Sequence, residues 1–123
     1  MIASNELDQD ELVFGVEILF NLAVELHEKL GIVFEYINIG GGFGIAYKPE
    51  QNPLNIGEVG EIIHQLYEQK ILASGHPEVA IVTESGRYIS GPFGYLVTRA
   101  LHEKKTYKHY IGVDACMANL MRP

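Results

Sequence analysis

The most constraining feature of this chain is a run of three glycines, Gly40–Gly42, that directly follows an apolar segment. Glycine loses more backbone freedom on folding than any other residue, so the run is unfavourable inside a helix or strand. Without side chains, however, its N–H groups can converge on an anion near the start of a helix. The run therefore predicts a phosphate-binding loop, and a plain tight turn between strand and helix is the alternative.

Helical and extended patterns alternate around this loop. A first helix is expected to begin at Asp8 or Asp10 and to end at Gly31. A second helix is expected to begin at Asn55 and to break within Ala73–Pro77. The buried face predicted for the first helix is the apolar repeat Phe14, Ile18, Leu22 and Leu26.

Two short apolar strands flank the second helix, at Ile32–Ile39 and Val79–Thr83. Strands of this kind, joined through a helix, predict a parallel sheet that is covered on its faces. Later in the chain, Tyr95–Leu101 and Tyr110–Val113 are expected to pair as a hairpin joined by the polar run Glu103–Lys108. This antiparallel pair suggests a separate layer or domain.

Glu84, Ser85, Gly86 and Arg87 follow the second predicted strand, as the glycines follow the first. Because neighbouring parallel strands end at the same edge of a sheet, the two loops should meet and form a ligand site. For Glu84, the alternatives are a solvated carboxylate or an ion pair with Arg87. The joint occurrence of the two loops favours a phosphate-bearing cofactor.

Composition excludes several classes of function. The net charge of −7 over 123 residues, without a basic stripe, argues against nucleic-acid binding. The single cysteine, Cys116, excludes an internal disulfide and fits a reducing compartment. We find no apolar run long enough for a membrane span, no signal peptide and no metal-ligand pattern, so a cytoplasmic protein is expected.

Three motifs occur in collinear order: N-I-G-G-G-F-G at 38–44, T-E-S-G-R-Y at 83–88, and V-D-A-C-M-A-N-L-M-R-P at 113–123. Together they resemble the diaminopimelate decarboxylase family of pyridoxal-phosphate enzymes, and the resemblance covers the whole chain. The first two motifs are shared with arginine and ornithine decarboxylases, and the third favours the diaminopimelate enzymes. One departure is Ser85, which stands where the family has proline.

The resemblance implies an α/β fold made of the C-terminal βα units of a (β/α)8 alanine-racemase-like barrel, ending in the first strands of a β domain. Residues 1–93 would be a partial pyridoxal-phosphate-binding barrel, and residues 94–123 the start of the C-terminal β domain. A complete barrel needs about 250 residues. The chain is therefore expected to be an internal fragment, inactive by itself. Its cut strand edges predict a homodimer or higher oligomer.

The resemblance also implies residue roles. Glu84 would pair with the pyridine nitrogen of the cofactor, and Arg87 and Arg122 would bind substrate. No lysine here matches the family's Schiff-base lysine, which would lie upstream, so no catalytic residue is expected. The full set of expected cofactor-binding residues is Ser4, Gly40, Gly41, Gly42, Glu84, Ser85, Gly86 and Arg87.

The activity implied for the parent enzyme is pyridoxal-phosphate-dependent decarboxylation of meso-diaminopimelate to L-lysine. Two alternatives are kept. The chain could be part of an arginine or ornithine decarboxylase, or it could be a non-catalytic module that binds a phosphate ligand.

Overall fold

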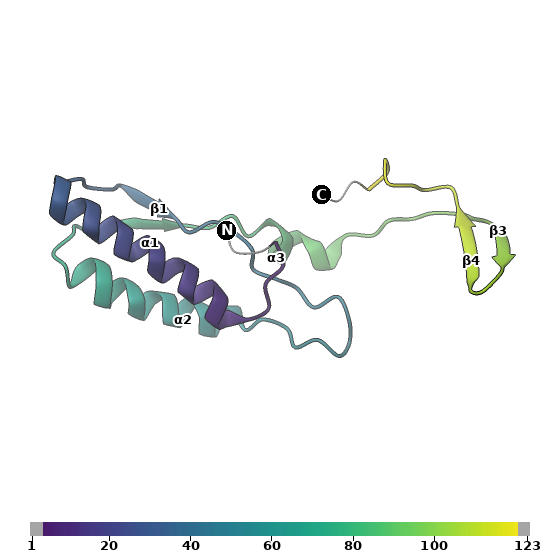
Figure 1. Cartoon of the computed structure of the whole chain (residues 1–123), viewed down its shortest axis with the longest axis horizontal. Helices are drawn as coiled ribbons and strands as arrows, with labels where there is room; N and C mark the ends of the chain where they lie inside the picture. Colours follow the sequence, from purple (N-terminus) through teal and green to yellow (C-terminus); the bar gives the residue numbers. More distant parts are fainter. Residues whose placement is uncertain (1–3, 121–123) are drawn as a thin grey trace. The chain divides into compact units, whose positions relative to one another are not determined.

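The computed structural model describes residues 4–120, which confirm the expected α/β class (Figure 1). The chain divides into two units, Met1–Pro92 and Phe93–Pro123. The first unit carries the helices and a parallel strand pair, and the second is built around an antiparallel hairpin.

The first helix, α1 (Gln9–Leu30), begins and ends where the sequence predicts. The Asp8 side chain accepts a hydrogen bond from the backbone N–H of Asp10 at 2.9 Å and so caps the helix start. Gly31 ends the helix in the left-handed conformation, with φ of 68°, and its N–H donates to the His27 carbonyl at 2.8 Å.

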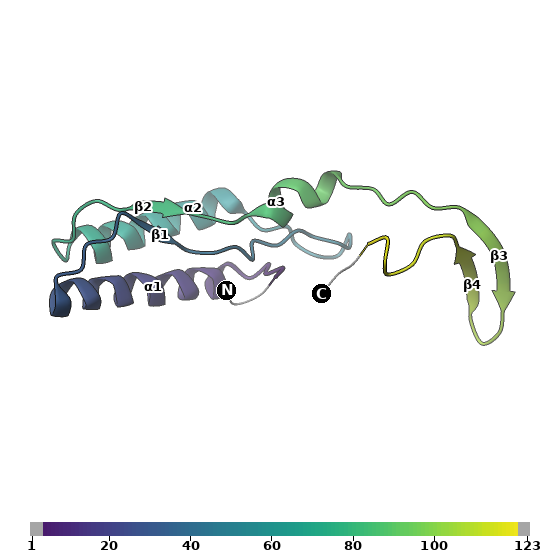
Figure 2. The same ribbon diagram turned by 90° about the horizontal axis from the view of Figure 1, so that it is seen from above.

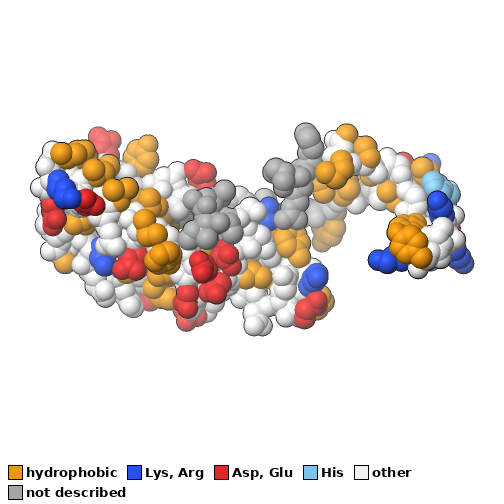
Figure 3. All heavy atoms as spheres, in the orientation of Figure 1, with side chains coloured by type: hydrophobic (Ala, Val, Ile, Leu, Met, Phe, Trp, Pro, Cys, Tyr) orange, Lys and Arg blue, Asp and Glu red, His pale blue; other side chains and the backbone are white. Residues whose placement is uncertain are grey.

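The predicted buried face of α1 was wrong. Phe14, Ile18 and Leu22 are 58%, 51% and 48% exposed, and Figure 3 shows apolar side chains in a row along this helix. The helix carries two apolar stripes with similar spacing, and the strand pair packs against the other one. The buried residues of α1 are Leu12, Val16, Phe20 and Ala23.

Strands β1 (Tyr36–Asn38) and β2 (Ala80–Val82) pair in parallel, as predicted, with Ile37 opposite Ile81. Both strands are shorter than the predicted ranges 32–39 and 79–83. Backbone hydrogen bonds extend the pairing slightly at both ends, from Glu35 with Ala80 to Gly40 with Glu84. The N–H of Phe34, just outside that stretch, faces the ring nitrogen Nε2 of His76 instead.

The second helix, α2 (Ile56–Leu66), is capped by Asn55 as predicted, and continues as the π-helical turn η1 (Tyr67–Leu72). Figures 1 and 2 show α1 and α2 side by side over one face of the strand pair. The core between these layers consists of Val16, Phe20, Ala23, Ile37, Ile71 and Val79. A second buried cluster, near the glycine loop, consists of Leu12, Phe43, Leu54 and Val59.

After β2 the chain forms the short helix α3 (Gly86–Ser90) and the 3-10 turn η2 (Gly91–Phe93). Strands β3 (Ala100–Lys105) and β4 (His109–Val113) then form the expected antiparallel hairpin. The predicted strand and connection boundaries were wrong, because the charged residues up to Lys105 belong to β3 and the turn occupies only residues 106–108. Polar residues are compatible with these strands because their side chains are exposed.

Candidate functional site

The two loops that follow β1 and β2 meet, as their positions in a parallel sheet predict. The N–H of Glu84 donates to the carbonyl of Gly40 at 2.8 Å. A Cβ atom on Gly41 would lie 2.4 Å from the carbonyl oxygen of Glu84. Glycine at this position therefore allows the loops to approach more closely than any side chain would permit.

Backbone conformation further explains the glycine run. Gly40 and Gly42 have φ of 76° and 97°, a region that residues with a Cβ rarely adopt. The loop therefore needs glycine at all three positions, two for conformation and Gly41 for space. These requirements hold whether or not a ligand is bound.

The N-terminal segment Ser4–Leu7 runs along the other side of the glycine loop. The N–H of Glu6 donates to the Gly42 carbonyl at 2.7 Å, and Asn5 exchanges two hydrogen bonds with the backbone of Ile45. Ser4 is exposed at the start of this segment. The N–H of Gly40 is bonded to Asn38, whereas the N–H groups of Gly41 and Gly42 have no acceptor among residues 4–120 and can be offered to a ligand.

The carboxylate of Glu84 is exposed and is held by an amide instead of a guanidinium. The Nδ2 of Asn38 donates to Oε1 of Glu84 at 2.6 Å. Within residues 4–120, Glu84 and Arg87 do not form the ion pair that was the alternative for them. The second carboxylate oxygen of Glu84 is available as an acceptor.

Arg87 supplies the clearest sign of a missing partner. Its Nη1 atom is buried and has no hydrogen-bond acceptor among the described residues. The side-chain stem passes close over the backbone of Gly91, where an added Cβ would lie 3.3 Å from Cγ. Burying a guanidinium N–H without an acceptor is costly, so an anion placed here would complete the site.

Among the described residues, no hydrogen bond joins the other predicted residues of the second loop, Ser85 and Gly86, to the glycine loop. The hydroxyl of Ser85 donates to the Thr83 hydroxyl at 3.1 Å, and Gly86 opens α3 at a point where an added Cβ would meet open space. Arg122 lies outside the described residues. Among residues 4–120, no three His, Cys, Asp or Glu side chains are grouped to hold a metal ion, and no helix is long and apolar enough to cross a bilayer.

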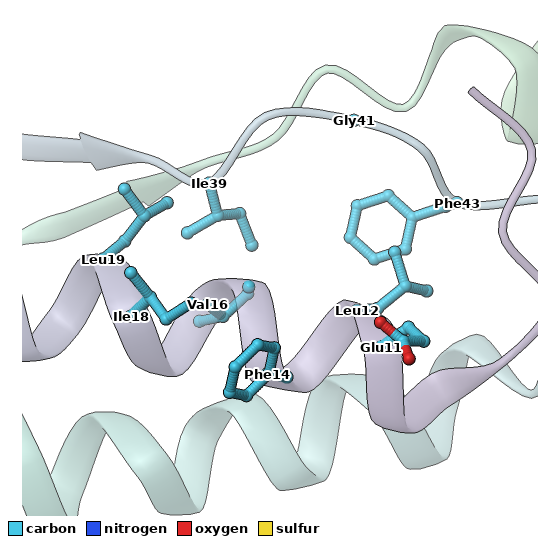
Figure 4. Close-up of a pocket in the computed structure, with 10 residues that line it drawn as sticks. Glu11, Leu12, Phe14, Val16, Ile18, Leu19, Ile39, Gly41 and Phe43 are labelled. Carbon is cyan, nitrogen blue, oxygen red and sulfur yellow. The ribbon is translucent and has the colours of Figure 1, made fainter. Parts of the chain in front are cut away.

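An apolar pocket of about 370 Å³ separates the glycine loop from α1 (Figure 4). Ile39, Gly41 and Phe43 line it from the loop side, and Phe14 and Ile18 lie on the helix side. The lining is apolar apart from Glu11, whose carboxylate would repel an anion, so this pocket does not suit a phosphate group.

Asn38 was not among the site residues predicted from the sequence, although its amide contacts both loops. Its Oδ1 accepts a hydrogen bond from the N–H of Gly40 at 2.8 Å, in addition to the Nδ2 bond to Glu84. The signal was present in the sequence, because an Asn side chain commonly bonds the backbone two residues on, and Gly40 is two residues after Asn38.

Comparison with known proteins decides what family this arrangement belongs to. Residues 2–91 match the family described as pyridoxal-dependent decarboxylase, pyridoxal binding domain. The chain belongs to the pyridoxal-dependent decarboxylases. The matched range contains both loops, the Ser4 segment and Arg87, and the α/β fold of the chain matches the barrel fold of this family.

Relatives within the pyridoxal-dependent decarboxylases share both sequence and structure with the chain. Diaminopimelate decarboxylase of Methanothermobacter thermautotrophicus is 40% identical over 99% of the chain. The crystal structure of diaminopimelate decarboxylase from M. jannaschi has a TM-score of 0.84 at 27% identity over 99% of the chain. That of Helicobacter pylori diaminopimelate decarboxylase, complexed with L-lysine, has a TM-score of 0.77 at 28% identity over 98%. The chain spans 28% of the length of each of these proteins.

The cofactor of this family is pyridoxal phosphate, and the residues present fit it. The Nη1 of Arg87, which has no acceptor among the described residues, can donate to an anion. Gly41 lies against the Glu84 backbone and has no side chain, so no side chain of its own covers the backbone of the glycine loop at this point. The exposed carboxylate of Glu84 offers the acceptor that a protonated ring nitrogen requires. Donors for a phosphate and an acceptor for the ring are thus present on neighbouring loops.

Proposed function

We propose that this chain forms part of a pyridoxal-phosphate-dependent decarboxylase that converts meso-diaminopimelate to L-lysine. The support is the naming of its relatives as diaminopimelate decarboxylases, one of them crystallised with L-lysine, together with the arrangement of its two loops. In the same proposal, the first unit supplies C-terminal βα units of the barrel and the hairpin unit begins the β domain. Lysine biosynthesis in the cytoplasm is the setting that follows.

The observations that carry the proposal are the buried Nη1 of Arg87, three residues after Glu84 in the chain, and the close approach of Gly41 to Glu84. The N–H groups of Gly41 and Gly42 and the guanidinium of Arg87 bind the cofactor phosphate. Gly40 shapes the loop, and Gly86 adds a backbone donor. A guanidinium suits this task because its planar donors match phosphate and carboxylate oxygens. Ser4 and Ser85 complete the proposed set at its margins.

Glu84 has a different role in the proposal. Its carboxylate accepts the ring N–H of the cofactor and keeps that nitrogen protonated. When bound, the protonated ring supplies an electron sink for the pair left behind as carbon dioxide departs. Glu84 is acceptor-only while ionised, so replacing its carboxylate by an amide removes this control of the proton.

Substrate recognition in the proposal uses arginine. Diaminopimelate carries two carboxylates, and Arg122 is proposed to bind the distal one, while Arg87 faces the phosphate or a substrate carboxylate. Arginine and ornithine each have only one carboxylate. A requirement for Arg122 in diaminopimelate turnover would therefore distinguish the proposed substrate from these two alternatives.

The experiment uses a protein that spans the length of the relatives and contains this segment. Absorbance of bound pyridoxal phosphate and release of carbon dioxide from meso-diaminopimelate, arginine and ornithine are measured. Arg87→Ala should weaken cofactor binding about tenfold or more, as expected for a lost charge-assisted contact. Lys29→Ala is a control, because Lys29 is exposed at the far end of α1.

Two results would contradict the proposal. Unchanged cofactor binding in Arg87→Ala would exclude this loop pair as the phosphate site. Faster carbon dioxide release from arginine or ornithine than from meso-diaminopimelate would replace the proposed substrate, and binding without any release from the three would favour a non-catalytic module.

A further inference from the structure

One side chain, Asn38, connects the two halves of the candidate site. Its Nδ2 donates to Oε1 of Glu84 at 2.6 Å, and its Oδ1 accepts from the N–H of Gly40 at 2.8 Å. The two contacts determine the orientation of the amide, because a flipped amide would place N–H against N–H and oxygen against carboxylate. Both functional groups of Asn38 are therefore committed to the site.

We infer that Asn38 is a positioning residue that aims the carboxylate of Glu84 at the cofactor ring while holding the glycine loop in place. This inference rests on the proposed function and adds to it a residue that contacts neither the phosphate nor the substrate. Asn38 acts only through Glu84 and Gly40.

The need for such a residue follows from the exposure of Glu84. A glutamate side chain has three rotatable bonds, and a solvent-exposed one samples several rotamers unless a contact selects one. A hydrogen bond to an ionised carboxylate is among the stronger ones in proteins. Because Asn38 occupies Oε1, it leaves Oε2 with a defined direction toward a ring N–H.

Strand register makes this contact possible. Asn38 is the last residue of β1 and lies opposite Val82, the last residue of β2. Glu84 follows two residues later, and its N–H is bonded to Gly40. The parallel sheet therefore places the amide and the carboxylate at the same edge, so that a short side chain such as Asn reaches across.

The two functions of the amide can be separated by substitution. Asn38→Asp keeps an acceptor for the N–H of Gly40. It replaces the donor Nδ2 by a carboxylate oxygen, so that two carboxylate groups, the one introduced at position 38 and that of Glu84, face each other. Asn38→Ala removes both contacts. If Asn38 only shaped the turn, the Asp variant would behave as the parent protein does.

The chain also contains a matched control. Asn55 makes the same two kinds of contact at the start of α2, but with one residue: its Oδ1 accepts from the N–H of Glu58 at 3.3 Å and its Nδ2 donates to Oε2 of Glu58 at 3.4 Å. Asn55→Asp creates the same local juxtaposition of carboxylates at a helix cap. It should leave every cofactor measurement unchanged.

The test uses a protein of the relatives' length, with pyridoxal phosphate labelled with ¹⁵N in its ring. Three readouts are compared among the parent, Asn38→Asp, Asn38→Ala and Asn55→Asp. They are the ¹⁵N resonance of the bound ring, which reports its protonation, the pH dependence of cofactor binding, and hydrogen exchange at the Gly40 amide.

In Asn38→Ala, which loses the contact that orients Glu84 and adds no charge, we expect the ring resonance to move toward the unprotonated form near neutral pH. In Asn38→Asp, the acidic limb of the pH profile of cofactor binding should move to higher pH by about one unit, because two close carboxylates retain a proton between them. Exchange at Gly40 should stay slow in Asn38→Asp and become at least about tenfold faster in Asn38→Ala, which has lost the acceptor.

The possible failures are distinguishable. If the parent protein binds no pyridoxal phosphate, the proposed function and this inference fail together. If the parent binds it, and Asn38→Ala leaves the ring resonance and Asn38→Asp leaves the pH profile as in the parent, the inference alone is overturned. Equal changes in Asn38→Asp and Asn55→Asp would also overturn it, since they would show a general effect of added charge.

Discussion

Substitution of Gly41 by alanine is expected to separate the two loops of the site. The added Cβ would lie 2.4 Å from the carbonyl oxygen of Glu84 and 3.3 Å from its carbon. Both are backbone atoms, so no side-chain rotation can relieve the clash. The shortest distances between a Cβ atom and a non-bonded atom in proteins are 3.0 to 3.4 Å. To reach this range from 2.4 Å, the two loops must move apart by roughly 0.6 to 1 Å.

The cost follows from this displacement. Overpacking of a well-packed site costs about 1 to 3 kcal/mol. The hydrogen bond from the Glu84 N–H to the Gly40 carbonyl, now 2.8 Å, would stretch to its limit and lose up to about 1 kcal/mol. We therefore expect Gly41→Ala to lower the free energy of unfolding by about 1 to 4 kcal/mol.

Gly60 provides the matched control. It lies within α2 with no atom near an added Cβ, so Gly60→Ala should raise the free energy of unfolding by about 0.5 to 1 kcal/mol through helix propensity. Urea denaturation of the 123-residue chain, followed by circular dichroism, measures both variants. Equal stability of Gly41→Ala and Gly60→Ala would refute the steric argument.

Three further predictions concern other parts of the molecule. The backbone N–H of Arg99 and the hydroxyl of Thr98 donate to Asp114 and lower the pKa of its carboxyl group. The contribution of Asp114 to hairpin stability should therefore be complete above about pH 4 and disappear as the pH falls through the lowered pKa of the folded state. Asp114→Asn should remove this pH dependence, as measured by unfolding monitored by NMR. In a protein that spans the length of the relatives and contains this segment, Glu84→Gln should lower kcat more than it changes KM, and an effect on KM alone would contradict the proposed ring-nitrogen role. The exposed apolar stripe of α1 predicts that the chain forms an oligomer at concentrations of tens of micromolar. Ile18→Glu should shift the mass measured by light scattering toward that of the monomer. A monomeric parent chain would contradict the predicted oligomer.

Several features could be predicted from the sequence because they depend on neighbouring residues. Asp8 and Asn55 cap helices by bonding backbone N–H groups two or three residues away, and Gly31 ends a helix through its own backbone freedom. The glycine run and the Glu84–Arg87 motif are also local features. Each directly follows a predicted strand, and together they predicted a ligand site where the two strands end. Their meeting follows from the direction of parallel strands, a rule that needs no knowledge of distant contacts.

The buried face of α1 needed the tertiary structure. Two apolar stripes run along this helix, and sequence periodicity cannot rank them when their spacings are alike. The choice depends on where the strands lie, and their position places Phe20 in the core and leaves Phe14 exposed. Strand length was decided in the same way, because β1 forms only where β2 supplies hydrogen-bond partners, and the N–H of Phe34 faces His76 instead.

The candidate site divides along the same line. Sequence alone determined which residue types are present: glycines that admit an approaching backbone, a carboxylate, and an arginine whose charge needs a partner. Only the tertiary structure decided that the Nη1 of Arg87 is buried without an acceptor among residues 4–120 and that Asn38 bonds Glu84. The physical reason is that burial and hydrogen-bond partnership join residues more than forty positions apart in the chain, and such contacts exist only after β1 and β2 have paired.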